Sequence, residues 1–422
     1  MMAWLSDVNT VYIFLAGAFG IFMAWGIGAN DVANAMATSV GSRALTIKQA
    51  LIIAAIFEFA GAYLAGGEVT NTIRSGIVSV EAFDDHPEYL VWGMLASLLS
   101  AGIWLTVASF QGWPVSTTHS IVGAIVGFAA VGVGTDAVSW GSVLNIATSW
   151  VFSPFIAGVL AFLVFTSIHK LVLDTRDPLK NARRYGPYYL FAVGFILSLV
   201  TVQKGLAHVG LNIPQGLEIF IAIGVGVVLA LVGAILIKKV AIDEQADKTF
   251  HFASVEKIFG VLMIFTASAM AFAHGSNDVA NAVGPMSAII SMVNEGGQLA
   301  AKSAVPGWVL LVGAVGIVLG LATFGYQVMM TVGKKITELT PTRGFSAEFA
   351  TASTVVVASY TGLPISTTHT LVGAILGVGF ARGIAAIDMR IVGNIFMSWV
   401  VTLPAGAILS ILFFFMLKGM FS

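Results

Sequence analysis

The chain has 422 residues, of which 58% are hydrophobic and 10% are charged, and its formal net charge at pH 7 is −1. Soluble domains carry about 25% charged residues, so this composition excludes a soluble globular protein and predicts an integral membrane protein that lies in a lipid bilayer. The near-zero net charge provides no basic surface for nucleic acid. The absence of cysteine excludes disulfides and thiolate metal sites.

About twelve apolar stretches are long enough to cross a bilayer or nearly so, since a spanning helix needs about 20 apolar residues. In chain order they are 9–27, 49–66, 89–109, 115–133, 143–169, 187–203, 216–238, 257–273, 307–333, 347–361, 367–381 and 391–417. The stretches 115–133, 347–361 and 367–381 are short or begin beside Pro or Gly, so we expect re-entrant half-helices among them. Residues 1–10 hold no Lys or Arg, so we expect the first stretch to be retained and not cleaved as a signal.

Basic residues indicate how these segments are oriented. Arg43, Lys48, the segment 170–184 and the pair at 238–239 lie in loops that alternate with the acidic loop 84–88, which has no Lys or Arg. Loops rich in Lys and Arg stay in the cytoplasm. We therefore expect a multi-pass protein of the cell (inner) membrane with its amino terminus outside.

Three sequence patterns occur twice, about 250 residues apart. Gly-Ala-Asn-Asp-Val-Ala-Asn-Ala at 28–35 returns as Gly-Ser-Asn-Asp-Val-Ala-Asn-Ala at 275–282. Pro-Val-Ser-Thr-Thr-His-Ser at 114–120 returns as Pro-Ile-Ser-Thr-Thr-His-Thr at 364–370. The third pair of patterns consists of Asn145 with Ser149-Trp150 and Asn394 with Ser398-Trp399.

The two copies are expected to face opposite ways in the membrane. The stretches 187–203 and 216–238 lie between two basic loops that are both expected in the cytoplasm, so the chain crosses the membrane outward and then back. The second copy therefore starts in the cytoplasm, whereas the first starts outside. We predict an all-α membrane protein with a first inverted repeat at 1–170, a connector with two transmembrane helices at 171–256 and a second inverted repeat at 257–422. This build is typical of secondary transporters, whose sites lie where the two halves meet.

Each Asn-Asp pattern places a carboxylate and two amides directly after an apolar run. Such residues are costly in hydrocarbon and indicate a functional site, and their oxygen atoms suit a hard cation. We expect the glycines at 26 and 28 to loosen the helix and free backbone carbonyls. The alternative is that these side chains only join helices by hydrogen bonds. The predicted cation ligands are Asn30, Asp31, Asn34, Asn277, Asp278 and Asn281.

Each Ser-Thr-Thr-His pattern follows a proline, which ends one helix and lets a serine N-cap start the next. The start of a helix presents free N–H groups and a positive dipole end, so it suits an anion. The alternative is that the hydroxyls only cap their own helix. His119 and His369 would orient a hydroxyl, sense pH or make a structural hydrogen bond. The predicted anion ligands are Ser116, Thr117, Thr118, Ser366, Thr367 and Thr368.

Lys and Arg are absent from these four patterns and from the whole segment between Arg74 and Lys170. An anion bound among these helices would face Asp31 and Asp278 without a basic side chain to neutralise it, so co-bound cations are needed. The sequence therefore favours cation-coupled anion transport, with two matched cation sites around one anion.

The duplicated patterns resemble the signatures of the inorganic phosphate transporter family, the PiT or solute carrier 20 type, over nearly the whole chain. This resemblance implies an inverted-repeat transporter of about twelve helices that imports phosphate on a sodium or proton gradient. Glu58 and Glu348, each a lone acid in an apolar stretch, are expected to couple ions or to gate, unless they only join helices. The short segment 238–257 favours a prokaryotic member. The resemblance implies essential roles for six residues, Asp31, Asp278, Ser116, Ser366, Glu58 and Glu348.

The resemblance does not decide the ion, because some members use protons and related proteins move sulfate. Asn, Thr and carbonyl oxygens around each aspartate favour sodium, since they would coordinate a metal ion and add little to carrying a proton. Phosphate is favoured over sulfate because its protons can be donated to nearby carboxylates. We expect a secondary active transporter that imports inorganic phosphate with sodium ions by alternating access, with no organic cofactor and no enzymatic activity.

Two further classes of function stay open. An anion channel would use the same helix starts but would not need paired aspartates. An intramembrane hydrolase would recruit Ser116, His119 and Asp31, but a nucleophile present twice has no evident use. The sequence is compatible with a homo-oligomer.

Overall fold

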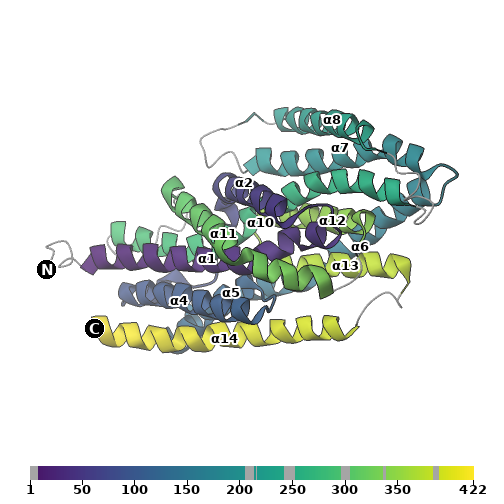
Figure 1. Cartoon of the computed structure of the whole chain (residues 1–422). Helices are drawn as coiled ribbons and strands as arrows, with labels where there is room; N and C mark the ends of the chain where they lie inside the picture. The colour runs from purple at the N-terminus through teal and green to yellow at the C-terminus, as the bar shows by residue number, and fades with distance from the viewer. Residues whose placement is uncertain are drawn as a thin grey trace.

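The computed structural model of the chain describes residues 8–204, 213–214, 216–241, 252–295, 305–335, 339–383 and 389–422. Within these ranges the chain forms 13 α-helices and no β-strand (Figure 1). Nine of the described helical segments are long and apolar enough to cross a membrane. The protein is an all-α integral membrane protein, as its composition predicts.

Each of the predicted apolar stretches coincides with one helix. The chain up to residue 170 forms α1 (Val8–Gly41), α2 (Ile47–Ala65), α3 (Gly67–Asn71), α4 (Pro87–Gln111), α5 (Thr117–Phe128) and α6 (Trp140–Ile168). Next come α7 (Pro178–Lys204) and α8 (Leu217–Lys238). The rest forms α10 (Ala253–Asn294), α11 (Gly307–Lys335), α12 (Pro341–Tyr360), α13 (Thr367–Arg382) and α14 (Met389–Phe421). Among the α-helices of the described residues, the short α3 has no counterpart in the predicted stretches.

Two of these helices are much longer than the predicted stretches 9–27 and 257–273. α1 has 34 residues and α10 has 42, and each continues as a helix through its Asn-Asp pattern. The expectation that glycine loosens the helix at 26–28 is therefore wrong. Gly28 serves close packing instead, because a Cβ atom there would lie 1.9 Å from the carbonyl oxygen of Ile317 on α11.

α1 and α10 run antiparallel through the centre of the molecule. Early in α1, a Cβ atom on Gly20 would lie 2.7 Å from the sulfur of Met286, which is late in α10. Towards the other end of the pair, Thr38 of α1 and Thr266 of α10 both donate hydrogen bonds to Glu348 of α12. The two Asn-Asp patterns thus meet on helices of opposite direction, which confirms the inverted topology of the repeats.

α4 and α5 form a helical hairpin that enters from the end of the molecule where α1 begins and α14 ends. At that end Tyr12 contacts Phe421, and Phe83, just before α4, contacts Phe128 at the end of α5. The tip of the hairpin reaches Asn30 in the interior of α1. The expectation of re-entrant half-helices is confirmed for α5. α4, which is long and apolar enough to cross a membrane, is the other arm of the hairpin, whose tip lies at the level of Asn30.

α12 and α13 form a matching hairpin that enters from the opposite end (Figure 1). At its open end, Glu256 in the first turn of α10 accepts hydrogen bonds from the backbone N–H and the hydroxyl of Thr342, at 2.8 and 2.9 Å. Its tip reaches Asn277. The two tips meet, because the hydroxyl of Thr118 donates to the carbonyl oxygen of Ile365 at 2.9 Å.

The two halves of the chain interlock. α5 packs on α14 and α13 packs on α6, so each hairpin lies against a long helix of the other half. The backbones nearly touch there, since a Cβ atom on Gly127 would lie 2.7 Å from the Cα of Ala407, and one on Gly377 would lie 2.0 Å from the carbonyl oxygen of Gly158. Small residues at such crossings allow helices to pack closely in a membrane.

α7 and α8 pair with each other at one edge of the molecule (Figure 1). α8 presents apolar side chains outward, including Phe220 at 71% exposure, as a lipid-facing helix does. The loop at 242–251, most of the polar segment expected between α8 and α10, lies outside the described residues. The side chains of Asn394, Ser398 and Trp399, from the third repeated pattern, also lie outside them.

Candidate functional site

The two Asn-Asp patterns and the two Ser-Thr-Thr helix starts converge in the middle of the molecule, where the hairpin tips meet α1 and α10. All twelve of the predicted cation and anion ligands are at most 2% exposed. Four elements supply them, α1, α10, and the first turns of α5 and α13. The patterns found far apart in the sequence therefore form one buried polar cluster.

The predicted helix starts are present in the structure. Ser116 and Ser366 have extended backbone and are the N-caps of α5 and α13. Their hydroxyl oxygens accept hydrogen bonds from the backbone N–H groups of His119 and His369, each at 3.2 Å. Both serines thus make the capping contact that the sequence left as an alternative to anion binding. The threonines that follow them face the Asn-Asp patterns.

Asn30 and Asn277 hold the hairpin tips in place. The Asn30 amide donates to the hydroxyl of Ser109 and to the carbonyl of Trp113, each at 3.1 Å. Asn277 makes the equivalent bonds to the hydroxyl of Ser359 at 3.1 Å and the carbonyl of Leu363 at 3.2 Å. Each side chain thus ties the end of one hairpin arm to its tip, which orients the helix start that follows.

Asn34 and Asn281 connect each Asn-Asp pattern to the hairpin of the other half. The Asn34 amide donates to the carboxylate of Asp31 at 2.9 Å and to the hydroxyl of Thr368 at 2.7 Å. The Asn281 amide donates to the hydroxyls of Thr117 and Thr118, each at 3.2 Å. The site is therefore built across the interface between the repeats.

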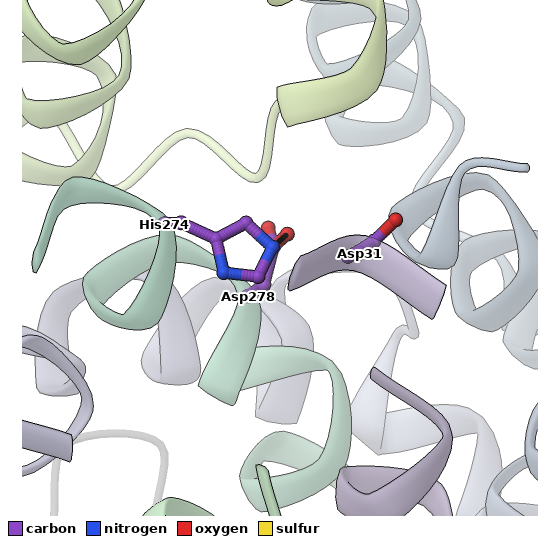
Figure 2. A group of neighbouring side chains, drawn as sticks. All are labelled: Asp31, His274 and Asp278. Atoms are coloured by element: carbon purple, nitrogen blue, oxygen red, sulfur yellow. Dashed lines mark ion pairs between the residues drawn. The ribbon is translucent and has the colours of Figure 1, made fainter. Parts of the chain in front are cut away.

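Asp31, His274 and Asp278 form the charged centre of the cluster (Figure 2). Their nitrogen and oxygen ligand atoms lie within 4.8 Å of one another. The His274 ring contacts Asp278 through Nε2 at 2.9 Å and Glu58 of α2 through Nδ1 at 3.2 Å. The hydroxyl of Thr367 donates to the same Asp278 oxygen at 2.9 Å.

His274 is a site residue that the sequence patterns missed. It lies directly before the second Asn-Asp pattern, and its signal is the presence of a histidine four residues before Asp278 in an apolar helix, where it shares a face with the aspartate. In the first copy the same position is Ile27. Because the two copies differ at this position, the repeated patterns do not include His274.

The partner of His274 breaks the repeat in the same way. α2 crosses α10 where a Cβ atom on Gly275 would lie 2.2 Å from the carbonyl oxygen of Glu58. At the corresponding crossing of α1 and α11, Gly28 faces Ile317. Asp278 is therefore flanked by an acid and an imidazole, whereas the matching positions around Asp31 are apolar.

The buried charges at this centre do not cancel. Asp31, Glu58 and Asp278 bring three carboxylates, and all three are 0% exposed. Even a positively charged His274 would leave two negative charges uncompensated. Arg74, on the turn after α3, is the one Lys or Arg among the buried residues of the described ranges. Unpaired charges in a membrane interior are costly, so the centre requires cations or protons.

The two Asn-Asp patterns contain buried oxygen atoms that could bind such a cation. Asp31 Oδ2, Asp278 Oδ1, Asn277 Oδ1 and Asn281 Oδ1 are buried and accept no hydrogen bond from the described residues. Buried acceptors are nearly always satisfied in native proteins. Carboxylate and amide oxygens are hard ligands, so this set of atoms fits sodium better than a transition metal.

Glu348 lies apart from this centre. Its carboxylate accepts hydrogen bonds from the hydroxyls of Thr38 and Ser39 on α1, each at 2.5 Å, and from Thr266 on α10 at 2.6 Å. Thr38 is two helical turns beyond Asp31. Of the two glutamates expected to couple or gate, Glu58 therefore joins the aspartate centre and Glu348 forms a separate, hydroxyl-lined site.

His119 and His369 face each other across the two hairpins. Their ring centroids are 4.4 Å apart with the rings nearly perpendicular, and both side chains are buried. They lie in the first turns of α5 and α13, beside the threonines of the site. The structure thus places them in contact with each other and not with Asp31 or Asp278 in any described hydrogen bond.

The chain is similar to phosphate transporters in both sequence and structure. Residues 27–410 match the sequence profile of the phosphate transporter family. A Haemophilus influenzae protein that bears the name of a phosphate permease is 53% identical over 421 residues, 100% of both chains. The chloroplast inorganic phosphate transporter 2-1 of Arabidopsis thaliana is 44% identical over 94% of this chain and 70% of its own length. A solved structure described as the sodium-dependent phosphate transporter superposes with a TM-score of 0.89 at 40% identity, covering 97% of this chain and 99% of that one.

Proposed function

The chain belongs to the phosphate transporter family, and from this premise we propose that it imports inorganic phosphate together with sodium ions by alternating access. The observation that carries the proposal is the burial of three carboxylates, those of Asp31, Glu58 and Asp278, in the same core as two helix starts. Helix starts attract anions, while the carboxylates attract cations. A site with both features suits the joint binding of a cation and an anion.

Two sodium ions would bind at the two Asn-Asp patterns, one near Asp31 and one near Asp278. The acceptor oxygens without a hydrogen-bond donor supply ligands at both places. Sodium is favoured over a proton because amide oxygens coordinate a metal ion and do not take up a proton. A relative of known structure carries the description sodium-dependent, which supports the same choice.

Phosphate would bind between the first turns of α5 and α13. The hydroxyls of Thr117, Thr118, Thr367 and Thr368 lie there, together with backbone N–H groups of both helix starts. Ser116 and Ser366 contribute by capping, which keeps these first turns in shape. The capping contact uses the two serine oxygens only as acceptors, so their hydroxyl hydrogens would remain free to donate to phosphate.

The Thr367 hydroxyl links the two ligands. It donates to Asp278 at 2.9 Å in the structure. A sodium ion bound by Asp278 would replace this donor and free the hydroxyl for phosphate. Sodium binding would then supply both the positive charge and a hydrogen-bond donor that phosphate needs, so phosphate would bind after sodium.

The α4–α5 and α12–α13 hairpins would act as the gates, because they enter from opposite ends of the molecule and their tips meet at the same site. Every predicted ligand is at most 2% exposed, so we assign this conformation to the occluded state of the proposed cycle. Movement of one hairpin would open the site to one side of the membrane and movement of the other to the opposite side. Two sodium ions with monovalent phosphate would carry one net charge, so a potential of 100 mV would drive import by about 2.3 kcal/mol.

The proposal also includes the location, orientation and repeat boundaries that the sequence predicts. We place the protein in the cell (inner) membrane, with the end of the molecule that holds the starts of α1 and α4 on the outside. The chain divides into repeats at 1–170 and 257–422 around the connector 171–256. No enzymatic activity is proposed, because Ser116, the hydrolase candidate, uses its hydroxyl as an N-cap.

Uptake of labelled phosphate into proteoliposomes tests the proposal. Purified protein would be given an inward sodium gradient, then a proton gradient alone, each with and without excess sulfate, and protein-free liposomes serve as the control. Uptake that requires sodium and is unaffected by sulfate is the expected result. Uptake on a proton gradient alone would assign the centre to protons, competition by sulfate would reassign the anion, and uptake that follows only the phosphate gradient would indicate a channel.

A further inference from the structure

The third repeated pattern, Ser149-Trp150, has no place in the function proposed so far. It lies in α6, outside the cluster of cation and anion ligands, yet Trp150 is only 8% exposed. A tryptophan buried in a membrane protein usually has a partner for its N–H group. The contacts of Trp150 therefore indicate its role.

Trp150 holds the α12–α13 hairpin at two points. Its indole Nε1 donates to the carbonyl oxygen of Pro364 at 3.1 Å. Its own backbone carbonyl lies beside the ring of His369. Pro364 and His369 stand on either side of Ser366, Thr367 and Thr368, so the two contacts lie on both sides of the helix start that faces the site.

Pro154 explains why the Trp150 carbonyl is available. In an uninterrupted helix this carbonyl would accept the N–H group four residues later, but Pro154, inside α6, has none. The proline therefore leaves a backbone acceptor directed at α13. The same region of α6 lies in backbone contact with α13, since a Cβ atom on Gly373 would lie 2.2 Å from the Pro154 carbonyl oxygen.

The indole also reaches the other hairpin. The ring of Trp150 lies 3.9 Å from that of His119, centroid to centroid, and His119 in turn contacts His369. Trp150 is thus in contact with the first turns of both α5 and α13 while it belongs to a helix that carries none of the predicted ligands.

We infer that Trp150 and Pro154 position the phosphate-binding start of α13, so that Thr367 and Thr368 meet α1 and α10 in the correct register. The inference rests on the proposed function, because it concerns how that site is kept ready for the anion. Trp150 acts through Pro364 and His369 and is a positioning residue, which makes no contact with the ligands itself.

The test is the kinetics of phosphate uptake by Trp150→Phe in proteoliposomes. Phe keeps an aromatic ring beside His119 but cannot donate to Pro364. Loss of one such hydrogen bond is expected to raise the KM for phosphate about two- to tenfold, with less than a twofold change in the maximal rate. Trp140→Phe is the matched control, since the Trp140 Nε1 on the same helix also donates to a carbonyl, that of Thr135 at 3.0 Å, at the far end from the site.

Pro154→Ala provides an independent variant. Ala restores the N–H group that the helix lacks, which would draw the Trp150 carbonyl away from His369, so the KM for phosphate is expected to rise in this variant as well. Thermal melting would show that each variant is folded. Pro154→Ala decides the inference if Trp150→Phe does not fold.

The outcomes separate this inference from the proposed function. Wild-type protein without sodium-dependent phosphate uptake would overturn the proposed function, whatever the variants do. Wild-type uptake combined with unchanged KM values in Trp150→Phe and Pro154→Ala would overturn the positioning role alone. A lower maximal rate with an unchanged KM, or an equal change in Trp140→Phe, would also overturn it, because that pattern indicates a general structural effect.

Discussion

Replacing Thr367 by valine is expected to change the binding of the two ligands differently. Valine has nearly the shape of threonine but no hydroxyl, so the change removes the donor that bonds to Asp278 at 2.9 Å. Asp278 keeps its contact with the His274 ring, also at 2.9 Å. The Asp278 carboxylate therefore keeps one of its partners, and the variant is expected to fold.

The size of the effect follows from the kind of bond that is lost. A hydrogen bond to a charged group contributes about 1.5–3 kcal/mol, which corresponds to a factor of about 10 to 100 in a binding constant. The KM for phosphate should rise by about this factor if the Thr367 hydroxyl serves phosphate in the loaded state. The sodium concentration for half-maximal uptake at saturating phosphate should fall, because sodium no longer has to displace a donor from Asp278.

Both constants can be measured by uptake of labelled phosphate into proteoliposomes. Thr370→Val is the matched control, because Thr370 also lies on α13 and is fully buried, and its hydroxyl donates to the backbone carbonyl of Ser366 one turn earlier, at 2.8 Å. This control should keep wild-type constants. A rise in both constants in Thr367→Val, or the same change in the control, would refute the proposed link between sodium and phosphate.

Three further substitutions test the packing and the charges. Gly28→Ala should lower the melting temperature, because its Cβ would lie 1.9 Å from the Ile317 carbonyl oxygen and overpacking costs about 1–3 kcal/mol. Gly17→Ala is the control on the same helix. Its Cβ would have nothing within 4 Å, so the melting temperature should stay unchanged or rise. Asp31→Asn should fold but raise the sodium concentration for half-maximal uptake about tenfold or more, because a cation near the site loses a carboxylate; wild-type sodium dependence would remove Asp31 from the site. Glu348→Gln should lower the melting temperature, since three hydroxyls lose a charged acceptor; an unchanged melting temperature would contradict this.

The two cation sites of the proposal are chemically different. The aspartates are repeated, but His274 and Glu58 stand at one of them where Ile27 and Ile317 stand at the other. The His274 ring contacts the Asp278 carboxylate directly at 2.9 Å, and it lies within 4.8 Å of the Asp31 carboxylate, so an ion at Asp278 would share its ligand with the imidazole. Substitutions at the two aspartates are therefore not expected to be interchangeable, although their sequence patterns are nearly identical.

Much of the architecture follows from local properties of the sequence. Apolar runs must become helices in a bilayer, because no other local structure satisfies the backbone there, so each predicted stretch coincides with a helix. Pro114 and Pro364 predict the breaks, and Ser116 and Ser366 predict the caps that start α5 and α13. The duplication of these patterns, together with the alternation of basic loops, predicts repeats of opposite orientation.

Tertiary structure decided which of these residues meet. Whether Asn30 serves a cation or a hairpin tip depends on where the α4–α5 tip lies, and that is set by contacts with residues some 80 positions away. Glu58 and His274 become partners only because α2 crosses α10 at Gly275. Local sequence determines helices and caps because each involves neighbours within one turn, whereas pairings between helices depend on crossing points fixed by packing of the whole chain.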